Sequence, residues 1–166
     1  LKRLPTIEDK LTRHPEMALS RMHDIGGCRA VLMTEDELRE VEKRLRDARG
    51  WSIKPDTPYD YIANPKPDGY RALHLVERRH GCQIEVQLRT MIQHAWAETV
   101  ERLDRQSRFG ELKLGRAPEQ VRDYYALGAT LLASKERGEP PDPQLLEQFR
   151  EMNRKVQQKP RRRGGR

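Results

Sequence analysis

The sequence is poor in cysteine and in aromatic residues, and it contains no long apolar run. Its two cysteines, Cys28 and Cys82, are far apart and form no CxxC pair, so neither a zinc site nor a disulfide framework is indicated. Both lie in apolar strand-like runs, and we expect buried free thiols. No stretch approaches the roughly 18 to 20 apolar residues that a bilayer-spanning helix needs, and LKRLPTIEDK lacks the apolar core of a signal peptide. We therefore expect no membrane partner and a cytoplasmic location, in the protein's own cell or in a target cell.

Charge is what the sequence has in abundance. Charged residues make up 36% of the 166 positions against 35% hydrophobic residues, and the formal net charge is +7. This balance predicts one compact domain with a lean core and a surface that attracts anions such as nucleotides, nucleic acid or acidic headgroups. Because the chain begins on Leu1 without a methionine, we expect it to be a fragment of a longer protein.

The first half of the chain predicts a helix, a strand and a second helix. Thr6 followed by acidic residues is typical of a helix start, and this helix should end near His14. Residues 24–33 are a strand candidate, because Cys28 to Met33 is nearly continuous apolar sequence, broken by one arginine, as expected for a strand covered on both faces. Thr34 and Glu37 then have capping-box spacing at the start of an amphipathic helix.

Residues 70–77 and 82–90 alternate with period two around a tight turn, which predicts an antiparallel hairpin. On the second strand Ile84, Val86 and Leu88 should share one face, with Glu85, Gln87 and Arg89 opposite; on its partner Tyr70, Ala72 and His74 should share a face. A short strand is also expected at residues 51–54.

Three helices should follow, within residues 91–105, 118–138 and 143–158, the last with an apolar stripe of Leu145, Phe149, Met152 and Val156. The order of elements predicts an α/β or α+β fold with a mixed sheet of about four or five strands and C-terminal helices. We expect a core over residues 1–110, a helical extension over 111–158 and a basic disordered tail over 159–166.

Two acids stand out, Asp24 at the entry to the first strand and Glu85 in the hairpin. Each is either salt-bridged for structure or held to bind a cation. A basic set on strands and loops accompanies them, and it comprises Arg29, Lys66, Arg71, His74 and Arg89. Since Mg²⁺ prefers one or two carboxylates plus phosphate oxygens, two acids beside a basic cradle fit phosphoryl or pyrophosphoryl transfer. Tyr70, after Asp68 and Gly69, is either a stacking platform for a base or an ordinary strand aromatic.

The segments SRMHDIGGCRAV, DYIANPKPDGYRALH and IEVQLRT occur in this order. Together they resemble the synthetase domain of the RelA/SpoT family, especially its small stand-alone alarmone synthetases, over residues from about Lys2 to about Glu101. The resemblance implies a nucleotidyltransferase-like fold in which ATP donates its β,γ-pyrophosphate to the 3′-hydroxyl of GDP or GTP and AMP leaves.

The resemblance also implies roles for individual residues. Asp24 and Glu85 would be catalytic and hold Mg²⁺, with Glu85 placed to take the proton of the attacking hydroxyl, and Tyr70 would stack on the acceptor base. Lys2 would grip the donor triphosphate. The remaining positions implied to line the nucleotide and phosphate site are Arg29, Lys66, His74, Gln87 and Arg89.

The sequence departs from the family pattern at Tyr59, where many members have lysine, at Asp68, where many have asparagine, and at Ala72, where many have serine. The first change weakens a phosphate contact, while Asp68 can still accept hydrogen bonds from guanine but repels phosphate. The acceptor is therefore less well defined than the reaction. Because no hydrolase region precedes the domain in these residues, a monofunctional synthetase with C-terminal helices that pack on the sheet or mediate a homo-oligomer is expected.

Two alternatives stay open from the sequence. The basic surface and the RRR tail also suit a toxin that pyrophosphorylates adenosine nucleotides or the 3′ end of tRNA. A catalytically silent RNA-binding module needs only the basic charge, and for it the two acids would be irrelevant.

Overall fold

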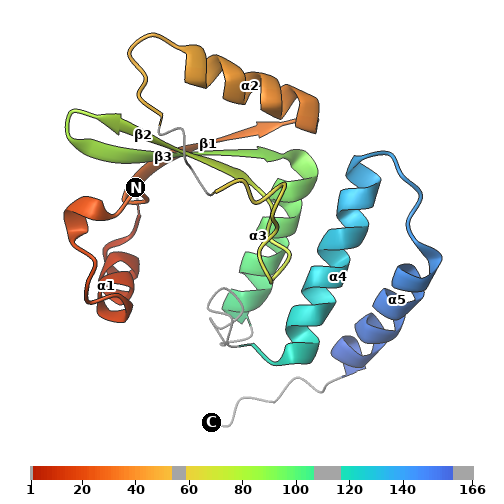
Figure 1. The fold of residues 1–166 in the computed structure, drawn as a ribbon. Helices are drawn as coiled ribbons and strands as arrows, with labels where there is room; N and C mark the ends of the chain where they lie inside the picture. Colours follow the sequence, from red (N-terminus) through yellow and green to blue (C-terminus); the bar gives the residue numbers. More distant parts are fainter. Residues whose placement is uncertain (1, 54–58, 107–116, 159–166) are drawn as a thin grey trace. The chain divides into compact units, whose positions relative to one another are not determined.

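A computed structural model describes residues 2–53, 59–106 and 117–158, and the structural statements below concern these residues. The chain divides into two compact units. The sheet unit comprises Leu1–Asn64 and Arg71–His94, and the helical unit comprises Pro65–Tyr70 and Ala95–Arg166 (Figure 1). The boundary predicted at residue 110 and the predicted tail at 159–166 lie outside the described residues. None of the described helices is long and apolar enough to cross a bilayer.

The sheet unit begins with α1 (Leu4–Arg13) and a 3-10 turn, η1 (Leu19–Arg21). The predicted cap at Thr6 is wrong, because the N-cap is Arg3 and no side chain caps the helix. Pro5 in the first turn explains the earlier start, since its fixed φ is compatible with the first helical positions and its missing N–H needs no partner there. The predicted end is confirmed, with His14 as the C-cap.

The sheet has three strands in the order β1-β3-β2: β1 (Gly26–Leu32), β2 (Leu73–Arg79) and β3 (Cys82–Thr90). β1 runs parallel to β3, and β2 is antiparallel to it. The predicted hairpin and the mixed sheet are therefore confirmed. The expected count of four or five strands is too high within the described residues, because Ile53 and Asp60 each make only an isolated bridge to β2.

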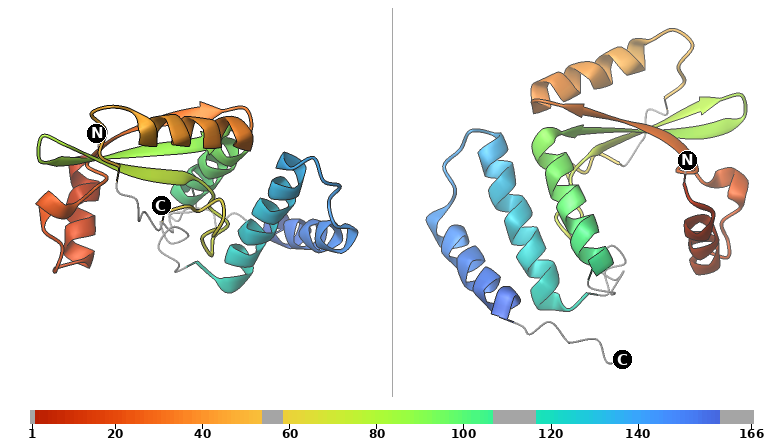
Figure 2. Two further views of the ribbon diagram at one scale, coloured as in Figure 1. Left: turned by 45° about the horizontal axis from the view of Figure 1, so that its top comes forward. Right: turned by 180° about the vertical axis from the view of Figure 1, so that it is seen from behind.

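The helix α2 (Glu35–Asp47) covers one face of the sheet (Figures 1 and 2). Its predicted cap is confirmed, since Thr34 Oγ1 accepts the Glu37 N–H at 3.2 Å; Glu37 Oε2 in turn accepts the N–H of Met33 at 2.9 Å. Leu38 is fully buried against inward-facing strand residues. The buried core of this unit is Leu38, Ile62, Leu73, Leu75, Val86 and Leu88.

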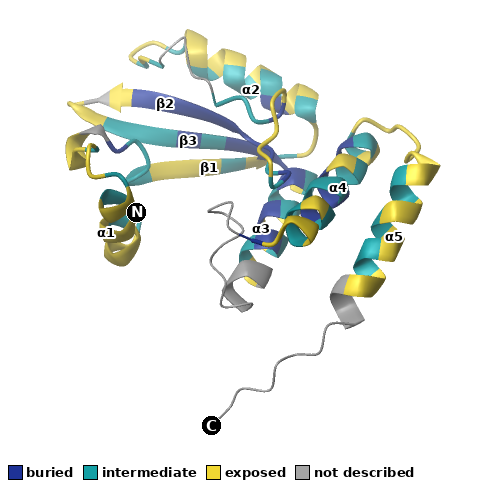
Figure 3. Cartoon of the chain, turned by 60° about the horizontal axis from the view of Figure 1, so that its bottom comes forward, coloured by how far each residue is buried: buried dark blue, intermediate teal, exposed yellow. Residues whose placement is uncertain are grey.

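Two expectations are wrong: the burial of β1 on both faces and the burial of the two cysteines. The strand is covered on one side only and lies at the edge of the sheet, where much of it is exposed (Figure 3). Cys28 lies on this edge strand and Cys82 lies beside the hairpin turn, so both thiols are exposed rather than buried. An unbroken apolar run does not distinguish an edge strand from a central one, because strand order depends on pairing over long sequence distances.

The helical unit contains most of α3 (Met91–Gln106) together with α4 (Glu119–Glu136) and α5 (Pro143–Gln158), as predicted. The three helices lie side by side (Figures 1 and 2). Tyr124 stacks on Phe149 with 5.0 Å between ring centroids, and Trp96 meets Tyr125 edge-on at 5.8 Å. The predicted stripe on α5 is half-buried at Leu145, Phe149 and Met152, while the side chain of Val156 is outside the description.

Candidate active site

The sheet face opposite α2 carries a row of polar side chains on β3. Glu85, Gln87 and Arg89 alternate with the core residues Val86 and Leu88, so the period of the strand places all three together. Gln87 Nε2 donates to Glu85 Oε2 at 2.6 Å, and Arg89 Nη2 donates to Gln87 Oε1 at 3.3 Å. The row is therefore hydrogen-bonded along its length.

Both neighbouring strands add a residue to this row. From β1, Arg29 Nε donates to Gln87 Oε1 at 3.2 Å, which gives the reason for an arginine in an apolar run. From β2, His74 Nδ1 lies 2.8 Å from Glu85 Oε1. His74 and Arg89 are each less than a tenth exposed. The sheet thus brings together five of the residues predicted for the site, which are Arg29, His74, Glu85, Gln87 and Arg89.

Glu85 is held as a carboxylate at neutral pH. Partial burial raises its pKa, but the hydrogen bond and the charge of His74 and the hydrogen bond from Gln87 outweigh burial, and the pKa lies below its ordinary value. Asp24 acts in the opposite direction and raises the pKa of Glu85. The two acids therefore lie close enough to interact electrostatically.

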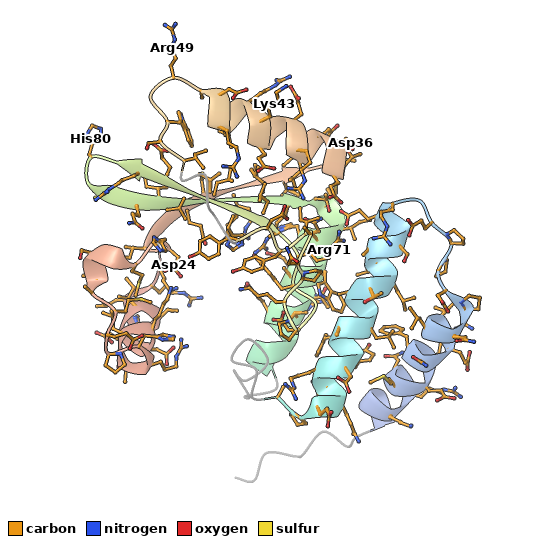
Figure 4. All side chains as sticks on the ribbon, viewed as in Figure 1. Asp24, Asp36, Lys43, Arg49, Arg71 and His80 are labelled. Carbon is orange, nitrogen blue, oxygen red and sulfur yellow. The ribbon has the colours of Figure 1, made fainter. Side chains whose placement is uncertain are left out.

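Asp24 precedes β1 on the side of the sheet where α1 lies (Figure 4). Its Oδ2 binds the Nζ of Lys2, and its Oδ1 binds the Nζ of Lys10 at 2.9 Å. Burial raises the pKa of Asp24, but the two lysines outweigh it and the pKa is lowered. Lys2 was predicted for the site, whereas Lys10 was not. Lys10 lies on α1, and the path of the chain between α1 and β1 determines whether it reaches Asp24. The spacing of residues in the sequence does not reveal that path.

Tyr61 is a second residue that the sequence did not single out. Its ring meets the His74 imidazole edge-on, with centroids 5.3 Å apart and planes at 88°. Burial raises the pKa of Tyr61, and the charges of Tyr59 and Glu85 raise it further. Tyr61 occurs in the DYI segment of the family motif, and that segment was the available signal.

Arg71, another residue predicted for the site, has a contact with α2 in the sheet unit. Its guanidinium lies 3.7 Å from Glu35 of α2, and its side chain is 9% exposed.

Lys66 and Tyr70 belong to the helical unit. The Lys66 Nζ lies over the Tyr70 ring, 5.0 Å from its centroid. Asp68 Oδ1 accepts the Tyr70 N–H at 3.0 Å, so this carboxylate caps the local turn. Tyr70 and Ala72 both precede β2, and of the row predicted for that strand His74 is the member within it.

The donor set of the sheet unit suits a hard cation that also binds phosphate. Among the residues that the structure describes, no group of three or more His, Cys, Asp or Glu is arranged as a metal cage. Asp24 instead raises the pKa of Glu85 by its charge, and cationic side chains bind Asp24. One or two carboxylates completed by phosphate oxygens is the usual protein environment of Mg²⁺. The residues present therefore fit Mg²⁺ bound together with a nucleotide.

Comparison with known proteins identifies relatives that are named for nucleotide pyrophosphate transfer. A GTP pyrophosphokinase of Bacillus subtilis, YwaC, is 33% identical over 87 residues, which cover 46% of this chain and 39% of that protein. A probable chloroplastic GTP diphosphokinase of Arabidopsis thaliana is 33% identical over 98 residues, which cover 58% of this chain and 13% of the relative. The chain thus matches well under half the length of these curated relatives.

Solved structures share the fold. Small alarmone synthetase 1 of Bacillus subtilis, bound to its product pppGpp, superposes with a TM-score of 0.67 at 23% identity over 90% of this chain and 75% of that chain. Small alarmone synthetase 2 of the same organism gives 0.67 at 23% identity over 90% of this chain and 77% of that one. The sequence profile described as the region found in RelA / SpoT proteins matches residues 1–104, which is more than half of the chain. On this match, the chain belongs to the RelA/SpoT family.

Proposed function

We propose that the protein is a Mg²⁺-dependent pyrophosphokinase that transfers the β,γ-pyrophosphate of ATP to the 3′-hydroxyl of GDP or GTP, yielding (p)ppGpp and AMP. The observation that carries the proposal is the fixed Glu85 carboxylate, held at 2.8 Å by His74 and at 2.6 Å by Gln87, with Asp24 within electrostatic range. Family membership supports the reaction class, and the names of the relatives support guanosine nucleotides as acceptors.

In the proposed reaction the 3′-oxygen forms a bond to the β-phosphorus of ATP. The bond from that phosphorus to the α-bridging oxygen breaks, and AMP leaves with the electron pair. Glu85 accepts the proton of the 3′-hydroxyl, and its lowered pKa keeps it ionised and ready to do so. The cationic side chains Arg29 and Arg89, which contact Gln87 beside Glu85, would bind phosphate oxygens by charge-assisted hydrogen bonds.

Asp24 and Glu85 would hold the Mg²⁺. When bound, the ion would neutralise charge on the phosphate oxygens of the nucleotide. Asp24 currently binds Lys2 and Lys10, whose side chains are 20% and 26% exposed. Long lysine side chains at partly exposed positions can reorient from the carboxylate to the triphosphate, in agreement with the role predicted for Lys2.

The test is an acceptor screen. Purified protein is incubated with ATP labelled in its β-phosphate, with Mg²⁺, and separately with GDP, GTP, ADP, a second portion of ATP, or tRNA. Label transferred to GDP or GTP and released AMP would support the proposal. Label on an adenosine nucleotide or on tRNA alone would support the toxin alternative instead, and no transfer to any acceptor would favour the silent module.

A matched pair of variants ties the transfer to the site. Glu85→Gln should abolish label transfer, while Glu40→Gln, which changes an exposed carboxylate on α2 of the same unit, should leave it unchanged. Equal activity of the two variants would contradict the assignment of Glu85.

A further inference from the structure

The turn formed by residues 66–70 rests directly on α4. Gly69 in this turn is buried and has φ +79°, a conformation that favours glycine. A Cβ atom at Gly69 would lie 2.5 Å from the Cβ of Ala129, 3.1 Å from the carbonyl oxygen of Tyr125 and 3.2 Å from the Cα of Ala126. The backbone of the turn therefore touches the backbone of α4, and the small side chain of Ala129 makes this approach possible.

The turn is internally rigid. Gly69 N–H donates to the Lys66 carbonyl at 2.8 Å, and Lys66 N–H donates to the Tyr70 carbonyl at 3.1 Å. Asp68 Oδ1 accepts the Tyr70 N–H at 3.0 Å, and the Lys66 ammonium lies over the Tyr70 ring. A displacement of Gly69 would therefore move Lys66 and Tyr70 with it.

The support under the turn is itself fixed. One residue before Ala129, Gly128 brings α4 against α3 and α5: a Cβ there would meet Trp96 at 2.8 Å and Phe149 at 3.0 Å. Tyr124 stacks on Phe149, and its hydroxyl donates to Asn153 Oδ1 at 3.0 Å. At Gly128, α4 therefore packs against α3 and α5. At the next residue, Ala129, it packs against the turn formed by residues 66–70.

We propose that α4 positions the acceptor-binding turn through the Ala129–Gly69 contact, so that the C-terminal helices determine the affinity for the acceptor nucleotide. This inference rests on the proposed function, since it takes Tyr70 as the residue that stacks on the acceptor base. Ala129 and Gly69 are positioning residues, because neither carries a group that would bind the nucleotide itself.

The kinetic test replaces Ala129 with leucine. Leucine keeps helix propensity high, so α4 should persist while the added bulk displaces the turn. The KM for the acceptor should rise about 5- to 150-fold, the range expected when one base–aromatic stack is lost, while the KM for ATP stays the same. Thr130→Leu, at the exposed neighbouring position of the same helix, should leave both KM values unchanged. Parallel changes in both KM values, or a loss of kcat alone, would overturn the proposal.

A second measurement needs no activity. Amide hydrogen exchange of residues 66–70 should be slow in the wild-type protein and become fast in Ala129→Leu, with the centre of α4 still protected. Gly69→Ala, which makes the clash from the turn and leaves the sequence of α4 unchanged, should give the same loss of protection in the turn. Exchange in the turn that is fast in the wild type, or unaltered in both variants, would refute the supporting role. Absence of transfer to every nucleotide would refute the proposed function separately, and the exchange experiment would still decide the role of α4.

Discussion

Replacing Glu85 by glutamine removes one negative charge and leaves the side-chain shape almost unchanged. Glutamine cannot take a proton from a hydroxyl, and positioned general bases contribute about 10²- to 10⁴-fold to rate. Because Glu85 is also one of the two acids proposed to hold Mg²⁺, the loss of kcat should reach or exceed the upper end of that range. Binding of GDP or GTP should persist, since the change removes little packing.

The same substitution should affect stability only modestly. It weakens the contacts at 2.8 Å to His74 and 2.6 Å to Gln87, and a hydrogen bond to a charged group contributes about 1.5–3 kcal/mol. It also removes the penalty of holding a charge at a site 18% exposed, and this gain offsets part of the cost. Single-turnover label transfer, nucleotide binding by calorimetry and urea unfolding separate these effects. Wild-type turnover in a folded Glu85→Gln protein would refute the assignment of the base, and loss of nucleotide binding would show that Glu85 serves mainly to shape the pocket.

Three further predictions follow from the described contacts. The pKa values of Asp24 and Glu85 are lowered in the folded state, so their stabilisation is complete at neutral pH and is lost as the pH falls below about 4; the urea midpoint should drop there, and less so in an Asp24→Asn/Glu85→Gln protein. His80→Asn should raise the free energy of unfolding, because exposed His80 at the hairpin tip (Figure 4) has φ +49° before Gly81 at +79°, and Asn-Gly is the preferred pair for such a hairpin turn. An unchanged free energy of unfolding would contradict this. Tyr61→Leu should lower kcat about two- to tenfold through loss of its edge-on contact with His74, whereas Tyr61→Phe should retain the rate; equal losses would assign the effect to the hydroxyl instead.

Local sequence signals predicted the elements whose causes are local. Thr34 and Glu37 are three residues apart and cap α2 as expected, and the alternation of residues 82–90 fixed which side chains of β3 face the core. The edge position of β1 was not predictable in this way. β1 pairs with β3, which is more than fifty residues away in the sequence, and no other described strand pairs with its second edge. Cys28 is exposed because it lies on this edge strand.

The site residues show the same contrast between local signals and long-range contacts. The alternation of side chains along β3 and β2 indicated a shared polar surface, and Glu85, Gln87 and His74 lie together on it. Lys10 and Tyr61 were missed because turns and isolated bridges determine their positions. Lys10 contacts Asp24 across the turn that follows α1, and Tyr61 contacts His74 from a segment that only bridges β2 at Asp60. Such segments have no period from which a direction can be read.

The lowered pKa of Glu85 affects how well this residue can act as the base in the proposed reaction. A carboxylate stabilised by His74 and Gln87 is a weaker base than a free one, so the arrangement sacrifices proton affinity for a fixed position and a constant charge. For a reaction that demands a strong base this would be a poor arrangement. Pyrophosphoryl transfer passes through a loose transition state in which little covalent chemistry is asked of the protein, and alignment with electrostatic stabilisation dominates. A base that is always ionised and held from two sides, with arginines alongside, therefore meets the needs of that reaction better than a stronger base in a looser site.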